Sequence, residues 1–390
     1  MATNLNRSSS TLAFSLITTL LFLAIFSRYD LPLLSNHISL AAAAGTSFFI
    51  LATIWLCRPS IATKTASLIT PLLLLAAWHF FAGISHSTLT AALYASFQIG
   101  AAVSLLLLGS EVTRHSFHYL RSSTVFISCF FVACVLLTCL IAANHIAGLD
   151  LGNPNYTPIL ALFITIYAAI FFHWRLFLFT ISVLVAPLLL ISIAEGARGG
   201  LLGVLAAITT YNLWPFFAKT TLRLLAFAAL HLSIMIGLTF LFAGVFLTAV
   251  LDPLEQFSQH LFGRHIYSGR DVLWPAMLIE ISKQPVLGVS LDVSPGSVVD
   301  RGWSAHNLLL QLGWHSGLPG VLFYAWFMFQ AFTTLGQSWS YDLSRTTAAY
   351  LSGVLIFTTF ETGLLYNQFA LTAPLWVLLG LTLARPSNRF

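Results

Sequence analysis

A histidine and two arginines are the residues of this chain whose types and surroundings point to chemistry. His306 lies in Ser-Ala-His-Asn ahead of an apolar run, where Ser304 is the expected helix cap. Arg198 sits in the turn Glu-Gly-Ala-Arg-Gly-Gly between two apolar runs, and Arg270 follows Ser-Gly ahead of a short amphipathic stretch. Guanidinium groups bind anions, and an imidazole exchanges protons near neutral pH. Arg264 and Arg301 are further cationic candidates with a weaker context.

The histidine also has a purely structural interpretation. His306, Leu310, Gly313, Gly317 and Gly320 follow one another at steps of 4, 3, 4 and 3 residues, which is the spacing of one helix face. Three glycines make such a face smooth, so another helix or a lipid chain could approach it closely. In that case His306 would only reach the membrane interface above a packing surface.

The other candidates have structural alternatives as well. Arg198 could pair with Glu195 at i,i+3 spacing. The triplet Asn153-Pro154-Asn155 forms a turn and a helix cap without needing any other role. Residue types alone leave these alternatives open.

The composition indicates that these side chains must be held by membrane helices. Of the 390 residues, 58% are hydrophobic and 7% are charged, and the mean hydropathy is +0.89. Soluble domains carry roughly 25% charged residues, so this chain has too few to cover a water-facing surface. The net charge of +5 does not come with a basic run interleaved with aromatic residues, which argues against nucleic-acid binding. The four cysteines lie in or at the end of apolar runs and are interpreted as small hydrophobic residues.

Apolar runs long enough to cross a bilayer recur along the whole chain. They predict an all-α integral membrane protein with about twelve transmembrane helices, the first retained rather than cleaved as a signal peptide. The expected spans are 11–27, 37–57, 67–84, 88–109, 123–147, 156–172, 176–194, 201–217, 224–250, 317–335, 346–364 and 368–384.

The distribution of basic residues predicts the orientation of these helices. If both termini are cytoplasmic, the short inner segments hold most of the 17 basic residues, whereas the short outer loops hold only Arg28 and Arg198. This is the bias of the positive-inside rule. The inner basic residues are Arg7, Arg58, Lys64, Arg114, Arg121, Arg175, Lys219, Arg223, Arg345, Arg385 and Arg389.

The same orientation places the one long hydrophilic segment, 251–316, on the outer side. It is expected to carry short helices, because Leu273, Trp274, Met277 and Ile281 form an apolar stripe. Such a helix would lie at the membrane surface or cap a cavity. The chain is thus expected to be one integral membrane domain, with nine helices in 1–250, an outer loop in 251–316, and three helices and a short cytoplasmic tail in 317–390.

Several motifs of phosphate and metal chemistry are missing from the sequence. There is no Asp-x-Asp or Glu-x-Asp pair on the expected outer side, no phosphate-binding glycine loop with Lys-Ser/Thr, no His-Glu-x-x-His and no Gly-x-Ser-x-Gly. No metal ligands and no cofactor are therefore predicted. Basic residues would have to neutralise a phosphorylated substrate by themselves.

Four motifs in order resemble landmarks of the O-antigen ligase family. The run 306–320, His-Asn, nine residues and Gly-Leu-Pro-Gly, resembles the ligase signature. The block 268–288 begins Ser-Gly-Arg-Asp-Val-Leu-Trp, ends Pro-Val-Leu-Gly, and resembles an element shared by the wider ligase and polymerase superfamily. Asn-Pro-Asn at 153–155 and Ala-Arg-Gly at 197–199 resemble two further landmarks. The motif resemblance covers roughly residues 150–325.

The resemblance implies a function at the periplasmic face of a bacterial inner membrane. It implies transfer of a polysaccharide from an undecaprenyl diphosphate donor to a sugar of a lipid A–core acceptor, within a GT-C-like architecture with a periplasmic loop at 251–316. His306, Arg198 and Arg270 would be catalytic, with His306 as base and the arginines on the diphosphate. Such a single displacement inverts the anomeric centre. The residues expected to contact substrate are Arg198, Arg270, Asn307, Asn153, Asn155, Arg301, Trp274, Gly317 and Gly320.

Three other functions compete with this interpretation. A repeat-unit polymerase of the same superfamily is disfavoured by the His-Asn-x9-Gly pattern, and a protein O-oligosaccharyltransferase by the short stretch 385–390 after the last expected span. A twelve-helix transporter typically has two related halves joined by a long central loop. Here the sixth and seventh spans are joined by little more than His-Trp-Arg at 173–175.

Overall fold

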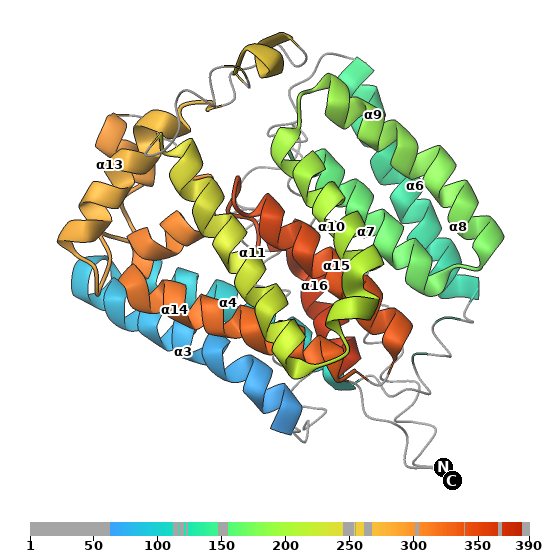
Figure 1. Ribbon diagram of the computed structural model, residues 1–390, viewed down its shortest axis with the longest axis horizontal. Coiled ribbons are helices and arrows are strands. Elements are labelled where there is room, and N and C mark those ends of the chain that lie inside the picture. Colours follow the sequence, from blue (N-terminus) through green and yellow to red (C-terminus); the bar gives the residue numbers. More distant parts are fainter. Residues whose placement is uncertain are drawn as a thin grey trace.

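A computed structural model of the chain describes residues 63–111, 117, 121, 124–146, 155–244, 253, 255–260, 267–300, 304–338, 340–365 and 369–383. Within these residues every regular element is a helix (Figure 1). In chain order they are α3 (Thr63–His86), α4 (Leu89–Glu111), α6 (Thr124–Ile146), α7 (Tyr156–Phe171), α8 (Trp174–Thr180), the π-helical turn η1 (Ile181–Val185), α9 (Ala186–Ala194), α10 (Arg198–Phe217), α11 (Thr221–Phe242), α13 (Arg270–Lys283), the 3-10 turn η2 (Pro295–Val299), α14 (Leu308–Gly336), α15 (Tyr341–Phe357) and α16 (Phe369–Thr382).

The helices agree with the expected all-α membrane architecture. Each expected span from 67–84 onward overlaps a helix, whereas the spans 11–27 and 37–57 lie outside the described residues. Among the described residues, five helical segments are long and apolar enough to cross a bilayer. They are Thr65–His86, Trp174–Ala194, Arg198–Phe217, Thr221–Phe242 and Leu308–Gly336. The full number of spans and the membrane side of each helix end remain predictions.

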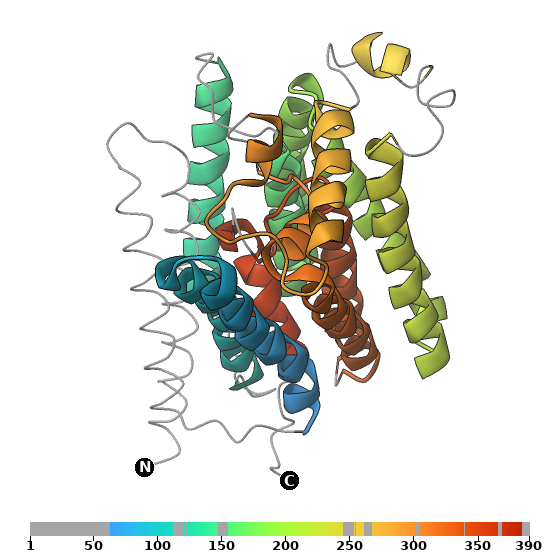
Figure 2. The same cartoon turned by 90° about the vertical axis from the view of Figure 1, so that its left-hand side faces the viewer.

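Two C-terminal helices form the centre of the bundle. Figures 1 and 2 show α15 and α16 in red between α6, α8 and α9 on one side and α3 and α14 on the other. From Leu343 to Phe357 almost every side chain of α15 is buried. Outward-facing positions of the surrounding helices carry large apolar residues instead, such as Leu190, which is 67% exposed, and Leu205, which is 59% exposed. This inside-to-outside pattern is typical of helices that face lipid.

Glycines bring α10 directly against the central helix α15. A Cβ atom on Gly203 would lie 2.7 Å from the carbonyl oxygen of Gly353, and one on Gly353 would lie 2.8 Å from the oxygen of Gly203. Neither position has room for a larger residue, because both contacts are with backbone atoms. This small-residue contact fixes the distance between the helix that begins at Arg198 and the helix that leads into residues 358–361.

Helix α14 begins close to where the sequence predicts a helix, but it packs differently. It starts at Leu308, its cap is Asn307 rather than Ser304, and it includes nine residues before the expected span 317–335. Gly317 has φ +66° and interrupts the helix, because a turn formed by Pro285 and Val286 presses its carbonyls against the position where a Cβ would be. The glycines therefore do not form one open stripe below His306, as the helical spacing had suggested.

The long segment expected on the outer side is folded onto the helices in its described part. Helix α13 buries the predicted apolar stripe, Leu273, Trp274, Met277 and Ile281, against other parts of the protein. Farther along, Asp292 accepts hydrogen bonds from both the backbone N–H and the hydroxyl of Thr88 at the start of α4. Such contacts hold residues 284–300 across the α3–α4 turn, so the segment is a structured part of the bundle.

Arginines at the opposite end of α10 are anchored to aromatic residues. The guanidinium of Arg345 lies 3.8 Å from the ring centre of Tyr211, and that of Arg223 lies 4.4 Å from the ring centre of Phe216. Tyr211 and Phe216 follow Arg198 in α10 by about 20 Å and about 27 Å at the helical rise per residue, so these charges are separated from Arg198 by most of the thickness of a hydrocarbon core. Basic and aromatic residues together are typical of the cytoplasmic interface that the charge count predicts at this end.

The close contact between α10 and α15 makes a testable prediction. Gly203→Ala should lower the free energy of unfolding by about 1–3 kcal/mol, because its methyl group meets a backbone carbonyl that cannot move alone. Gly237→Ala in α11 is the matched control, because a Cβ there meets nothing within 4 Å and alanine favours a helix by about 0.5–1 kcal/mol. Thermal unfolding in detergent, followed by tryptophan fluorescence, measures both. Equal stability of the two variants would contradict this packing.

Candidate functional site

His306 is held in an unusual backbone conformation at the start of α14. Its φ angle is +47°, in the left-handed region that costs a residue with a Cβ about 1–2 kcal/mol. The neighbouring Ala305 is fixed on both sides, because its carbonyl accepts a hydrogen bond from Nε1 of Trp274 at 2.8 Å and its N–H donates to Oε1 of Gln311 at 3.3 Å. Strain of this kind persists only where the surroundings impose it, and it concentrates at functional sites.

Asn307 ties the same loop to two other parts of the bundle. Its Oδ1 accepts the N–H of Leu310 at 2.9 Å, which caps α14. Its Nδ2 donates to the hydroxyl of Thr239 at 2.8 Å and to the carbonyl of Thr359 at 3.0 Å. The side chain is fully buried. The structure therefore gives Asn307 a capping and tethering role, and the expected substrate contact stays a prediction.

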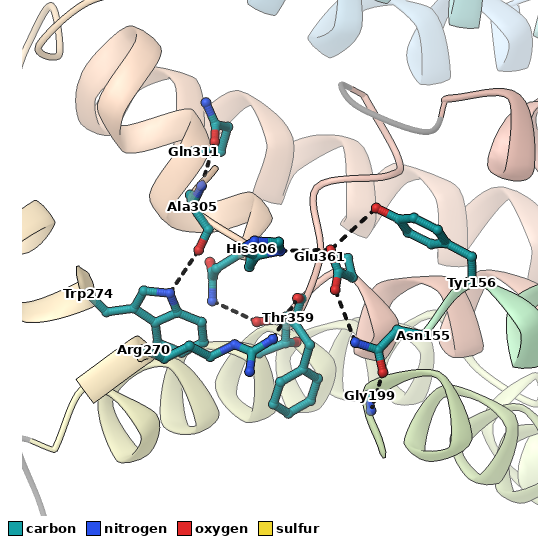
Figure 3. Close-up of polar contacts among 12 residues, drawn as sticks. Asn155, Tyr156, Gly199, Arg270, Trp274, Ala305, His306, Gln311, Thr359 and Glu361 are labelled. Carbon is teal, nitrogen blue, oxygen red and sulfur yellow. Dashed lines mark hydrogen bonds and ion pairs between the residues drawn. The ribbon is translucent and has the colours of Figure 1, made fainter. Parts of the chain in front are cut away.

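A buried carboxylate that the sequence analysis did not single out faces the histidine. Oε2 of Glu361 lies 3.0 Å from Nδ1 of His306, and the side chain of Glu361 is only 2% exposed, whereas that of His306 is 37% exposed. Asn155 donates from Nδ2 to Oε1 of the same carboxylate at 3.1 Å, and the Tyr156 hydroxyl lies 3.5 Å from Oε2 (Figure 3). Glu361 belongs to the apolar span 346–364, and an ionisable residue in such a span is itself an indication of function.

Arg270, the first residue of α13, lies beside this carboxylate. Its Nη2 donates to the carbonyl of Phe360 at 3.3 Å, and its guanidinium lies 5.7 Å from the ring centre of Phe360 and 5.8 Å from that of Trp274. Its Nε is buried and has no hydrogen-bond partner among the described residues. Burial lowers the pKa of Arg270 and the charge of Glu361 raises it, but a guanidinium keeps its charge at neutral pH in either case. The buried Nε is therefore a donor that remains to be satisfied.

Arg198, the first residue of α10, is linked to the same region through its helix. Its guanidinium donates to the hydroxyls of Ser258 at 2.7 Å and Ser268 at 3.0 Å. The next residue, Gly199, donates its N–H to Oδ1 of Asn155 at 3.2 Å. A Cβ on Gly199 would lie 2.9 Å from the side chain of Phe360, so only glycine lets α10 start this close to the site.

Four consecutive residues after α15 hold the site together. The carbonyl of Thr358 accepts the N–H of Leu308 at 2.9 Å. The carbonyls of Thr359 and Phe360 accept the side chains of Asn307 and Arg270, as described above, and Glu361 binds His306 and Asn155. We call residues 358–361 the anchor loop. Because it contacts the starts of α7, α13 and α14, and Phe360 also packs against Gly199 at the start of α10, it fixes the histidine and both arginine-bearing helices relative to one another.

The remaining expected site residues fall into two groups. Asn153 and Arg301 lie outside the described residues. Trp274, Gly317 and Gly320 are buried and make close contacts within the protein, with Gly320 against Ser316, and their expected contact with a substrate stays a prediction. Asn155 does belong to the site, as the orienting partner of Glu361.

The charged groups of the site are the guanidinium groups of Arg198 and Arg270 and the carboxylate of Glu361. Each arginine is the first residue of a helix, at the end where the aligned peptide dipoles place positive partial charge. Anions are favoured at such positions. Over the part of the chain that the structure covers, no group of three or more His, Cys, Asp or Glu residues is arranged to hold a metal ion. Arginines and an imidazole are the groups that this site offers to a substrate.

The free energy of unfolding tests whether Asn307 caps α14 and tethers the loop. Asn307→Ala should lower the free energy of unfolding by about 2–4 kcal/mol, because it removes a helix cap and leaves the buried acceptors of Thr239 and Thr359 without their donor. Thr220→Ala at the cap of α11 is the matched control and should cost only about 1 kcal/mol, since that hydroxyl accepts from Arg223 at an exposed position. Chemical unfolding in detergent measures the difference. Equal losses would show that the two tethers contribute nothing.

Comparisons with known proteins do not place the chain in a family. It matches no model of a protein family, no curated protein and no solved structure. The function proposed below therefore follows from the residues and contacts of this chain and from the sequence motifs given above.

Proposed function

We propose that this protein is a membrane glycan transferase of the O-antigen ligase type. It would move a polysaccharide from undecaprenyl diphosphate to a sugar of lipid A–core, at the periplasmic face of a bacterial inner membrane. One observation carries the proposal. A half-exposed histidine, oriented by a buried carboxylate, lies beside a guanidinium whose buried Nε has no protein acceptor within the described residues.

The arginines match the needs of a diphosphate leaving group. When the bond between the anomeric carbon and the phosphate oxygen breaks, its electron pair leaves with the diphosphate as negative charge. Fixed guanidinium groups stabilise that charge most when they are already in place before the reaction. Arg270 is held by the Phe360 carbonyl and two aromatic rings, and Arg198 by two serine hydroxyls, so both are positioned in advance.

The histidine matches the needs of the attacking hydroxyl. An acceptor hydroxyl must lose its proton as its oxygen bonds to the anomeric carbon. Neutral imidazole takes such a proton well at physiological pH. In the structure, no described residue makes a hydrogen bond with Nε2 of His306, and the ring is 37% exposed, so this nitrogen is open to a hydroxyl. A single displacement of this kind inverts the anomeric configuration.

Proximity of the functional helix ends to one another supports the same function. The starts of α7, α10 and α14 and the end of α15 are all expected on the periplasmic side from the charge count. All four lie at the anchor loop or are bonded to it through Asn155. A lipid-linked donor and a lipid-linked acceptor both present their sugars at a membrane surface, so a site at the helix ends is accessible to both.

Transfer in vitro tests the proposal. The wild-type protein, incubated with an undecaprenyl diphosphate-linked polysaccharide and lipid A–core, should form the conjugate, and EDTA should not prevent it. His306→Ala should reduce the rate by about 10²–10⁴-fold through loss of the base, and Arg270→Ala by about 10²–10³-fold through loss of leaving-group stabilisation. NMR of the product linkage should show inversion.

Matched substitutions outside the site control for general damage. His260→Ala, at an exposed position, and Arg345→Ala, at the opposite end of the bundle, should retain the wild-type rate. Full activity of His306→Ala would rule out the proposed base. Transfer of the donor glycan onto a second lipid-linked repeat, with none onto lipid A–core, would identify a polymerase instead.

A further inference from the structure

The hydrogen bonds around Glu361 determine the direction of each donor. Gly199 contributes a backbone N–H, which can only donate, so the atom of Asn155 that faces it must be the amide oxygen. The Nδ2 group of Asn155 therefore faces Oε1 of Glu361 as a donor. The partners of Asn155 thus fix the orientation of its side-chain amide.

The carboxylate then fixes the ring tautomer of His306. An ionised carboxylate is an acceptor only, so the nitrogen that lies 3.0 Å from its Oε2 must carry a hydrogen. That nitrogen is Nδ1. In a neutral imidazole the lone pair must then be on Nε2, the nitrogen that is open in this structure. Arg270 keeps a positive charge close to the same carboxylate.

We propose that Glu361 is the positioning residue for His306, and that Asn155 couples it to the arginine-bearing start of α10. This inference rests on the proposed function and extends it. In the reaction the acceptor O–H bond breaks and its proton moves to Nε2. The oxygen forms a bond to the anomeric carbon, and the electron pair of the broken carbon–oxygen bond leaves with the diphosphate. Glu361 stabilises the imidazolium that results, without taking the proton itself.

The coupling through Asn155 links the two halves of this chemistry. One amide group binds the base partner Glu361 on one side and the backbone of Gly199 on the other. Gly199 directly follows Arg198, so any shift of the first turn of α10 also moves the carboxylate under the histidine. The base and the diphosphate-binding arginine are thereby held in register by one side chain.

Glu361→Gln is a near-isosteric test of this proposal. A glutamine offers one oxygen and one NH₂ group, so it cannot accept from both His306 and Asn155. If its oxygen faces His306, its NH₂ group faces the NH₂ group of Asn155 and one donor is left without an acceptor. If its NH₂ group faces His306, Nδ1 must accept that hydrogen bond, which moves the ring hydrogen to Nε2. We expect kcat to fall by about 10²–10⁴-fold, the range for a catalytic histidine held in the wrong tautomer, with little change in the KM for the lipid-linked donor.

A second substitution should restore the directions of the hydrogen bonds between positions 155, 361 and His306. When Glu361→Gln is combined with Asn155→Asp, the new carboxylate at position 155 accepts both the N–H of Gly199 and the new amide at position 361. The amide oxygen at position 361 can then accept from Nδ1 of His306. We expect the kcat of the double variant to be at least tenfold higher than that of Glu361→Gln, although each substitution alone reduces kcat. Glu280→Gln, at a surface ion pair with Lys283, is the matched control and should leave kcat unchanged.

Nitrogen NMR of the full-length protein tests the tautomer without any substrate. The signals of His306 in ¹⁵N-histidine-labelled protein are assigned by their loss in His306→Ala and recorded well above pH 6.5, where imidazoles are neutral. Wild type should show hydrogen on Nδ1, Glu361→Gln should shift it toward Nε2, and the double variant should restore it. A wild-type ring with hydrogen on Nε2 would overturn the proposal, as would an unchanged tautomer and unchanged kcat in Glu361→Gln.

The two measurements separate this inference from the proposed function. If the tautomer responds as expected but wild-type protein transfers no glycan, the positioning role stands and the proposed reaction fails. If wild-type protein transfers glycan but neither the tautomer nor kcat responds to Glu361→Gln, the reaction stands and the positioning role fails. Thermal unfolding of each variant shows whether it is folded.

Discussion

The carboxylate of Glu361 is buried beneath His306 and accepts hydrogen bonds from groups on separate helices. An unpaired charge in such a place would cost several kcal/mol, so it requires donors in defined positions. His306 precedes α14, Asn155 precedes α7, and Arg270 opens α13. The need to satisfy this one charge therefore sets the relative positions of three helix starts, and the backbone carbonyls of the anchor loop add further bonds to two of them.

The rest of the fold makes this arrangement possible by close packing. Gly203 and Gly353 let α10 approach α15 until backbone atoms touch, and Gly199 lets the start of α10 lie against Phe360. On the other side, the turn at 285–288 presses into the break at Gly317, and Trp274 holds the carbonyl of Ala305. Because these contacts involve backbone or buried groups, they leave little freedom at His306, whose strained backbone depends on them.

Sequence patterns predicted the elements better than the contacts between them. Apolar runs located the helices from α3 onward, and the stripe containing Trp274 predicted α13, because burial on one face leaves a helical period in the sequence. The expected span 317–335 covers only the later part of α14, because Gln311 and Ser316 lower the hydropathy of a preceding stretch that is nonetheless helical and buried. The pairing of Glu361 with His306 joins residues 55 positions apart, and no local pattern encodes such a contact.

The roles of His306, Arg198 and Arg270 all require the diphosphate to bind between them. A cryo-electron microscopy structure of the protein in lipid nanodiscs with undecaprenyl diphosphate tests this directly. We predict that the phosphates contact Arg270 through Nε, with Arg198 on the same group, and that Nε2 of His306 faces the position of the missing sugar. A diphosphate bound away from both arginines, or a His306 ring turned away from Glu361 in that complex, would contradict the account.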